Sequence, residues 1–155
     1  MRSARAATTG RRALLAMLAG LAGCVEPVDV GPPLRPACSA APANPDHVVR
    51  FKTDIRDAIF LREDLCVRCH TAMGKTPIGL AVSGLELSSY ARLRQGGAVG
   101  GMNTVVPGDP CASVLIQKLG PAPPFGGRMP LDGPYLQPEE LQTIVDWIAA
   151  GALDD

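Results

Sequence analysis

Apolar residues recur at the spacing of an α-helix in the C-terminal two thirds of the chain, and no stretch alternates at the spacing of a strand. The first predicted helix follows Thr53, which can cap it. Its apolar positions are Ile55, Ala58, Ile59 and Leu65. This pattern predicts an all-α fold.

Two further helices carry start and stop signals. Asp109 followed by Pro110 has the form of an N-cap with proline in the first turn, so it predicts a helix through about Leu119. Pro138, followed by two glutamates, opens the last helix, and Gly151 can end it in a left-handed conformation. The apolar stripe of this last helix consists of Leu141, Ile144, Val145 and Ile148.

The N-terminus has the pattern of an export signal. Residues 1–12 are rich in arginine and hold no acid, and the apolar run 13–23 fits a signal-peptide core while being too short to span a bilayer. The run ends in LAGC, residues 21–24, which resembles a bacterial lipobox. We predict a lipoprotein signal peptide over residues 1–23 and lipidation of Cys24. The alternative is an ordinary signal peptide with a chance cysteine.

A proline-rich segment follows the signal. Residues 24–46 contain six prolines and no aromatic residue, which predicts an extended tether in front of a domain over residues 47–155. All six aromatic residues of the chain lie beyond residue 50. Six is few for a core of this size, which indicates that a flat cofactor supplies part of the apolar bulk.

The distribution of charge argues against a nucleic-acid partner. The chain has 15 basic and 15 acidic residues, but residues 1–23 hold four of the arginines and no acid. The remainder therefore carries a net charge of −4 and shows no basic stripe.

The most informative segment is CVRCH, residues 66–70. The thiols of Cys66 and Cys69 can reach the two vinyl groups of one haem, and His70 then lies under the iron as an axial ligand. The spacing predicts one covalently attached haem c. Three alternatives stay open: half of a zinc site, a thioredoxin-type redox pair, and a disulfide between the two cysteines.

From Phe51 to its end, the chain resembles the short class I cytochromes c of planctomycete-type and myxobacterial proteins. The matching pieces are the helix and haem motif at 51–70, SGLELSS at 83–89, the Gly-rich loop and Ser-containing helix at 96–119, RMP at 128–130, and the closing helix at 133–152. The resemblance implies a small cytochrome c-like helical domain around one haem. It also implies a short helix after SGLELSS, and a closing helix that crosses the first with Trp147 near Ala58 and Ile59.

The same resemblance implies a methionine as sixth iron ligand, at Met129 in the Met-Pro loop. Met102, in the Gly-rich loop, and His47 remain alternatives, whereas Met73 lies too close to His70 to pass around the ring. Two weaker roles are also candidates, the first by the resemblance and the second by the charge of the residue. The carbonyl of Pro77 is a candidate partner for the second nitrogen of His70, with an ordinary turn as the alternative. Arg128 is a candidate partner for a haem propionate, with a solvated surface arginine as the alternative.

Two cysteines remain after these assignments. Exported proteins tend to pair leftover thiols, so Cys38 and Cys111 are predicted to form a disulfide, with two unpaired thiols as the alternative.

Together these features predict a lipid-anchored monohaem c-type cytochrome, a one-electron carrier and not an enzyme, facing the periplasm in the cell envelope. Val25 replaces the Asp associated with inner-membrane retention, which favours the outer membrane. The expected partners are redox proteins and the membrane, reached through the lipid anchor. The alternatives are a five-coordinate haem peroxidase or gas-binding protein, and a haem-bearing accessory subunit of a larger membrane complex.

Overall fold

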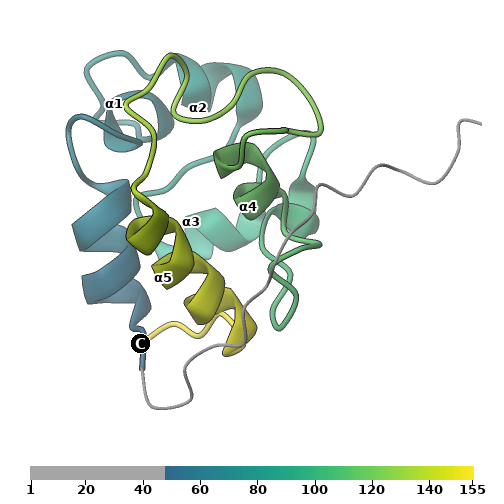
Figure 1. Ribbon diagram of the computed structural model, residues 1–155. Helices are drawn as coiled ribbons and strands as arrows, with labels where there is room; N and C mark the ends of the chain where they lie inside the picture. Colours follow the sequence, from purple (N-terminus) through teal and green to yellow (C-terminus); the bar gives the residue numbers. More distant parts are fainter. Residues whose placement is uncertain (1–47) are drawn as a thin grey trace, which may run out of the picture. The chain divides into compact units, whose positions relative to one another are not determined.

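The computed structural model describes residues 48–155, which are helical and contain no strand (Figure 1). The all-α prediction is therefore confirmed for this part of the chain. The predicted signal peptide and tether, with Cys24, Cys38 and His47, lie outside the described residues. The elements in chain order are η1 (Phe51–Phe60), α1 (Val67–His70), α2 (Ile78–Ser83), α3 (Tyr90–Gln95), η2 (Gly101–Thr104), α4 (Val114–Leu119) and α5 (Pro138–Ala149).

The first predicted helix is present as η1, but it is wound as a π-helix. Its N–H groups reach back five residues, as in the bond from Leu61 to the carbonyl of Arg56 (2.8 Å). Its buried face consists of Phe51, Ile55, Ile59 and Phe60. Ala58 is exposed, so its predicted place on the apolar face is wrong. The wider turn of a π-helix rotates this position away from the core.

The start of η1 also differs from the prediction. Arg50 stands at the N-cap, three residues before the predicted cap Thr53, and its N–H donates to Oδ2 of Asp54 (2.8 Å). The Thr53 hydroxyl donates to Oδ1 of Asp54 (2.9 Å) and caps no helix. Leu65 is buried, as expected, but it lies in the turns that follow η1.

The closing helix α5 agrees with its prediction at both ends. Pro138 occupies the first turn, and a capping box joins Gln137 to Glu140, whose Oε2 accepts the Gln137 N–H (2.8 Å). Gly151 follows the helix with a φ of 107°, in the left-handed region that favours glycine. In the predicted stripe, Ile144, Val145 and Ile148 are buried and Leu141 is partly buried.

Three aromatic rings join α5 to the start of the domain. The Trp147 ring lies 5.3 Å from the Phe51 ring and 6.5 Å from the Tyr90 ring, between centroids. The Phe51 and Tyr90 rings meet edge to face at 5.4 Å. The packing of α5 against η1 agrees with the expected crossing. The ring contacts of Trp147, however, are with Phe51 and Tyr90, whereas the expected neighbour Ala58 is exposed.

The helix predicted over residues 110–119 is shorter than expected, because α4 begins only at Val114. Residues 110–112 form a turn in which Oδ1 of Asp109 accepts the N–H of Ala112 (2.9 Å). The buried Ser113 hydroxyl accepts the N–H of Val106 (2.9 Å) and donates to the Asp109 carbonyl (2.9 Å). The aspartate therefore caps a turn, and these bonds delay the helix by one turn.

Candidate haem-attachment site

The segment 66–70 forms a single helical turn that brings both thiols and the imidazole together. The N–H groups of Cys69 and His70 both donate to the carbonyl of Cys66, at 3.2 and 2.9 Å. Both thiols are free. The alternative of a disulfide between Cys66 and Cys69 is therefore contradicted.

The Cys66 thiol is buried, and burial raises its pKa to about 12. A thioredoxin-type cysteine has the opposite property, a lowered pKa that makes the thiolate available at neutral pH. Cys69 is half-buried at the other end of the same turn. The raised pKa of Cys66 therefore argues against a disulfide-exchange centre at this pair.

The two ring nitrogens of His70 have different surroundings. Its Nδ1 lies 3.1 Å from the carbonyl oxygen of Leu85, and its Nε2 has no hydrogen-bond partner among residues 48–155. Burial lowers the pKa of His70, which favours the neutral ring. A backbone carbonyl accepts only from Nδ1–H, so this contact selects the tautomer with a lone pair on Nε2, the form that binds metals.

The partner of His70 is Leu85 and not the candidate Pro77, for which an ordinary turn was the stated alternative. The Pro77 carbonyl accepts the N–H of Ala81 (2.9 Å) in the first turn of α2. The segment containing Leu85 runs beside the histidine, where Leu87 donates its N–H to the His70 carbonyl (2.9 Å). The only sequence signal for this segment was its SGLELSS pattern. That pattern predicted the short helix that follows, now observed as α3 with the Ser89 side chain as its cap, but not the contact.

Gly79 is a second residue of the site that sequence reasoning missed. It lies in α2, and a Cβ built on it would come within 2.8 Å of Nε2 and 2.9 Å of Cε1 of His70. Contacts this short are essentially never seen for a real Cβ. The absence of a side chain at Gly79 therefore lets α2 pack directly against the imidazole.

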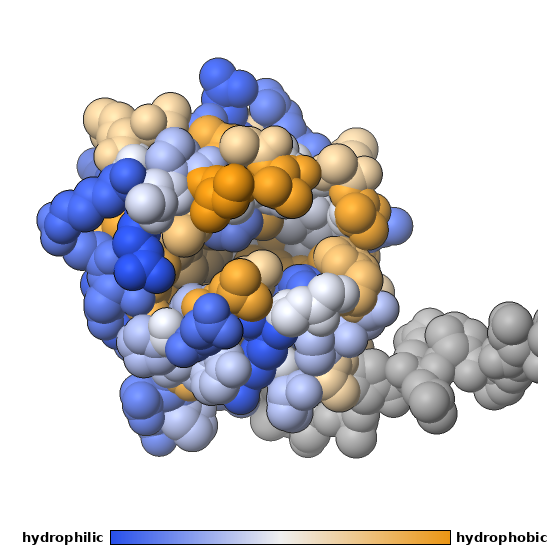
Figure 2. All heavy atoms as spheres, turned by 90° about the horizontal axis from the view of Figure 1, so that it is seen from above, coloured by the Kyte–Doolittle hydropathy of each residue, from blue (hydrophilic) through white to orange (hydrophobic). Residues whose placement is uncertain are grey.

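The end of the domain that carries α1 and α2 is hollowed. Figure 2 views this end from above and shows a depression bordered largely by apolar residues. On α2, Ile78 and Val82 are 62% and 76% exposed, and the Met73 side chain in the preceding turn is 92% exposed. Ile78 and Val82 lie four positions apart on α2 and so on one face of it, which gives this end of the domain an exposed apolar surface.

Met129 lies in the segment between α4 and α5, which crosses the same end of the domain in Figure 1. Its side chain is partly buried and packs against the core, and its N–H donates to the Lys118 carbonyl (2.8 Å). Met102, on η2, is 72% exposed. Of these two candidate ligands, Met129 is the one with a fixed and partly buried position.

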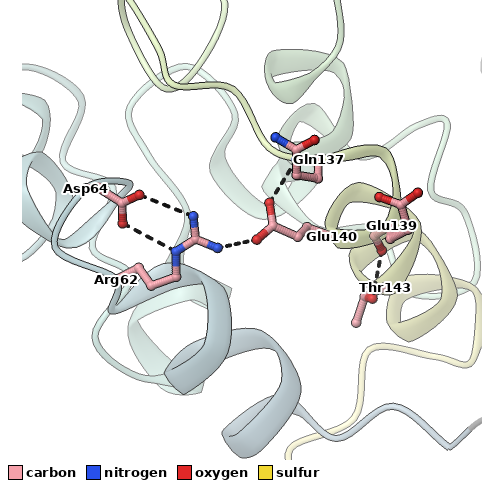
Figure 3. A network of polar contacts seen from close by, with 6 residues as sticks. All are labelled: Arg62, Asp64, Gln137, Glu139, Glu140 and Thr143. Atoms are coloured by element: carbon pink, nitrogen blue, oxygen red, sulfur yellow. Dashed lines mark hydrogen bonds and ion pairs between the residues drawn. The ribbon is translucent and has the colours of Figure 1, made fainter.

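A charged network ties the segment before Cys66 to the start of α5 (Figure 3). Nε and Nη2 of Arg62 each donate to an oxygen of Asp64 at 3.3 Å, and Nη1 donates to Glu140. The hydrogen bonding between Arg62 and Asp64 raises the pKa of Arg62 and lowers the pKa of Asp64. Because Glu140 also closes the capping box of α5, one carboxylate anchors both segments.

Arg128 is partly buried and makes two contacts within the domain. Its Nε donates to the carbonyl of Leu119 (2.8 Å), and its guanidinium lies 3.9 Å from the centroid of the Tyr135 ring.

Cys111 is disulfide-bonded. Its predicted partner, Cys38, lies outside the described residues, so the pairing of these two stays a prediction.

No protein-family model matches the chain, and no curated protein or solved structure was found to match it. Within residues 48–155, no group of three or more His, Cys, Asp and Glu side chains is arranged to hold a metal ion. Over the same residues, no helix has the length and apolar character needed to cross a membrane.

Proposed function

We propose that this protein is a lipid-anchored monohaem c-type cytochrome that carries single electrons in the cell envelope. The observation that carries the proposal is the state of His70. Its Nδ1 is engaged by the Leu85 carbonyl and its Nε2 has no partner among residues 48–155, on the same helical turn as two free thiols. A histidine that ligates iron binds it through one ring nitrogen, and its other ring N–H almost always donates a hydrogen bond.

The residues present fit a covalently bound haem. Cys66 and Cys69 would hold it through two thioether bonds, His70 would bind the iron through Nε2, and Met129 would supply the sixth ligand. When bound, the haem supplies a reversible one-electron change at its iron. The exposed apolar side chains of α2 and the apolar border of the hollow in Figure 2 suit a large flat apolar group.

The partly buried position of Met129 favours electron transfer over chemistry at the iron. A filled sixth position leaves no site for peroxide or a gas, and a thioether ligand raises the potential relative to a second histidine. His70 is the only histidine among residues 48–155, so no second imidazole in this part of the chain can act as a distal base.

The proposed location rests on the N-terminal sequence. Cys24 would carry the lipid, and residues 24–46 would hold the domain off the membrane, with the outer membrane favoured by Val25. Redox proteins of the cell envelope are the proposed partners.

The decisive experiment is expression of the full chain in a bacterium that matures c-type cytochromes. We expect haem to remain with the polypeptide on a denaturing gel, and a reduced-minus-oxidised spectrum typical of six-coordinate low-spin haem c. His70→Ala should lose the low-spin spectrum, and Cys66→Ser combined with Cys69→Ser should lose covalent haem. Met73→Ala, at an exposed position beside the motif, is the matched control and should change neither. Failure of the wild-type chain to retain haem contradicts the proposal, and prompt CO binding at neutral pH would support a five-coordinate haem protein instead.

A further inference from the structure

One residue at the end of α4 holds the segment that carries Met129 at three points. The backbone carbonyl of Lys118 accepts the N–H of Met129 (2.8 Å). The Nζ of Lys118 donates to the carbonyls of Phe125 and Gly127, each at 2.5 Å. The same ammonium lies 4.7 Å from the centroid of the Phe125 ring. Positions 125, 127 and 129 are therefore all bonded to a single helical residue.

Arg128, which belongs to the same segment, contacts both the end of α4 and Tyr135. Its Nε donates to the Leu119 carbonyl (2.8 Å), and its guanidinium stacks on Tyr135, further along the chain toward α5. The last carbonyls of a helix have no partner inside the helix. The loop satisfies two of them at the end of α4, those of Lys118 and Leu119, and is docked by the same bonds.

We infer that Lys118 and Arg128 are positioning residues for Met129: they hold the 120–137 loop closed so that the thioether stays at the iron. The inference rests on the proposed function, in which Met129 is the axial ligand. Met129 lies next to Arg128, and its own N–H is bonded to α4, so its backbone cannot move away without breaking these contacts. Removing either contact set should let the loop open more often.

The test measures loop opening in the ferric holoprotein. An external ligand such as cyanide binds a six-coordinate iron only after the methionine leaves, so its binding rate reports how often the loop opens. In Lys118→Gln we expect covalent haem to be retained, the Met–iron charge-transfer band to weaken, and cyanide to bind about tenfold faster or more. This fold-change corresponds to the loss of one or two ordinary hydrogen bonds. Lys52→Gln, which removes the same charge from an exposed position on η1, is the matched control and should leave the rate unchanged.

A second pair of variants separates positioning from general stability. Arg128→Gln removes the guanidinium from Tyr135 and from the Leu119 carbonyl, and it should speed cyanide binding in the same way. Ile144→Val, in the core face of α5, should lower the free energy of unfolding without changing the cyanide rate. If Lys118→Gln does not fold, Arg128→Gln decides the question alone.

Met129→Ala distinguishes the failure of this inference from the failure of the proposed function. If the wild-type chain holds no haem, the proposed function fails and the inference fails with it. If Met129→Ala keeps the charge-transfer band, Met129 is not the ligand and the inference is overturned while the haem assignment survives. If Met129→Ala loses the band but Lys118→Gln and Arg128→Gln bind cyanide at the wild-type rate, only the positioning role is wrong.

Discussion

Replacing Gly79 by alanine tests the packing of α2 against His70. The added methyl group would lie 2.8 Å from Nε2 and 2.9 Å from Cε1 of His70, and 3.0 Å from the carbonyl oxygen of Cys69. The imidazole is held by Leu85 and the carbonyl belongs to the backbone, so neither can yield as a flexible side chain would. Overpacking of this kind typically costs about 1–3 kcal/mol.

One effect opposes this cost. Gly79 lies in α2, where alanine is preferred over glycine by about 1 kcal/mol. Two of the contacts are below 3.0 Å, so the clash is the larger contribution, and we expect the free energy of unfolding of the holoprotein to fall by up to about 2 kcal/mol. For a domain of this size, each kcal/mol lowers Tm by roughly 4–8 °C.

The measurement is denaturant unfolding of the holoprotein, together with its ferric spectrum, which reports any change at the iron. Gly120→Ala is the matched control, because a Cβ there meets the carbonyl oxygens of Ile116 and Gln117 only at 3.5 and 3.6 Å, ordinary contact distances. The φ of Gly120 is −75°, which alanine adopts without strain. If Gly79→Ala is as stable as the wild type and its spectrum is unchanged, the close approach of α2 to the imidazole is wrong.

Three further experiments test the remaining assignments. Met129→Ala should keep covalent haem, lower the potential and admit CO. Met102→Ala should leave the spectrum nearly unchanged, because Met102 is exposed on η2. Loss of the Met–iron band in Met102→Ala alone would reverse the ligand assignment. Cys24→Ser should release a haem-loaded protein from washed membranes, since the lipid would be its anchor, and retention in the membrane would contradict this. Peptide mapping without reductant should recover one peptide pair joined through Cys38 and Cys111, and alkylation of both thiols would end that prediction.

Features with a local cause were predictable from the sequence. The helix α5 begins at Pro138 and is followed by Gly151 at positive φ, because an N-terminal proline and a C-terminal glycine act through their own backbone conformations. The turn at 66–70 brings two thiols and an imidazole together for a similar reason, since positions three and four apart share one side of a helix. The chemistry of the site therefore follows from five consecutive residues.

What the sequence determined by itself is thus the helical class, the closing helix and the identity of the motif. Only the tertiary structure decided which groups surround that motif. Leu85 reaches His70 across fifteen positions, and Gly79 touches the ring because α2 folds back on α1. Ala58 is exposed because η1 is a π-helix and not an α-helix. Each of these outcomes depends on contacts between distant segments, whose geometry is set by the packing of the whole domain and leaves no periodic signal in the chain.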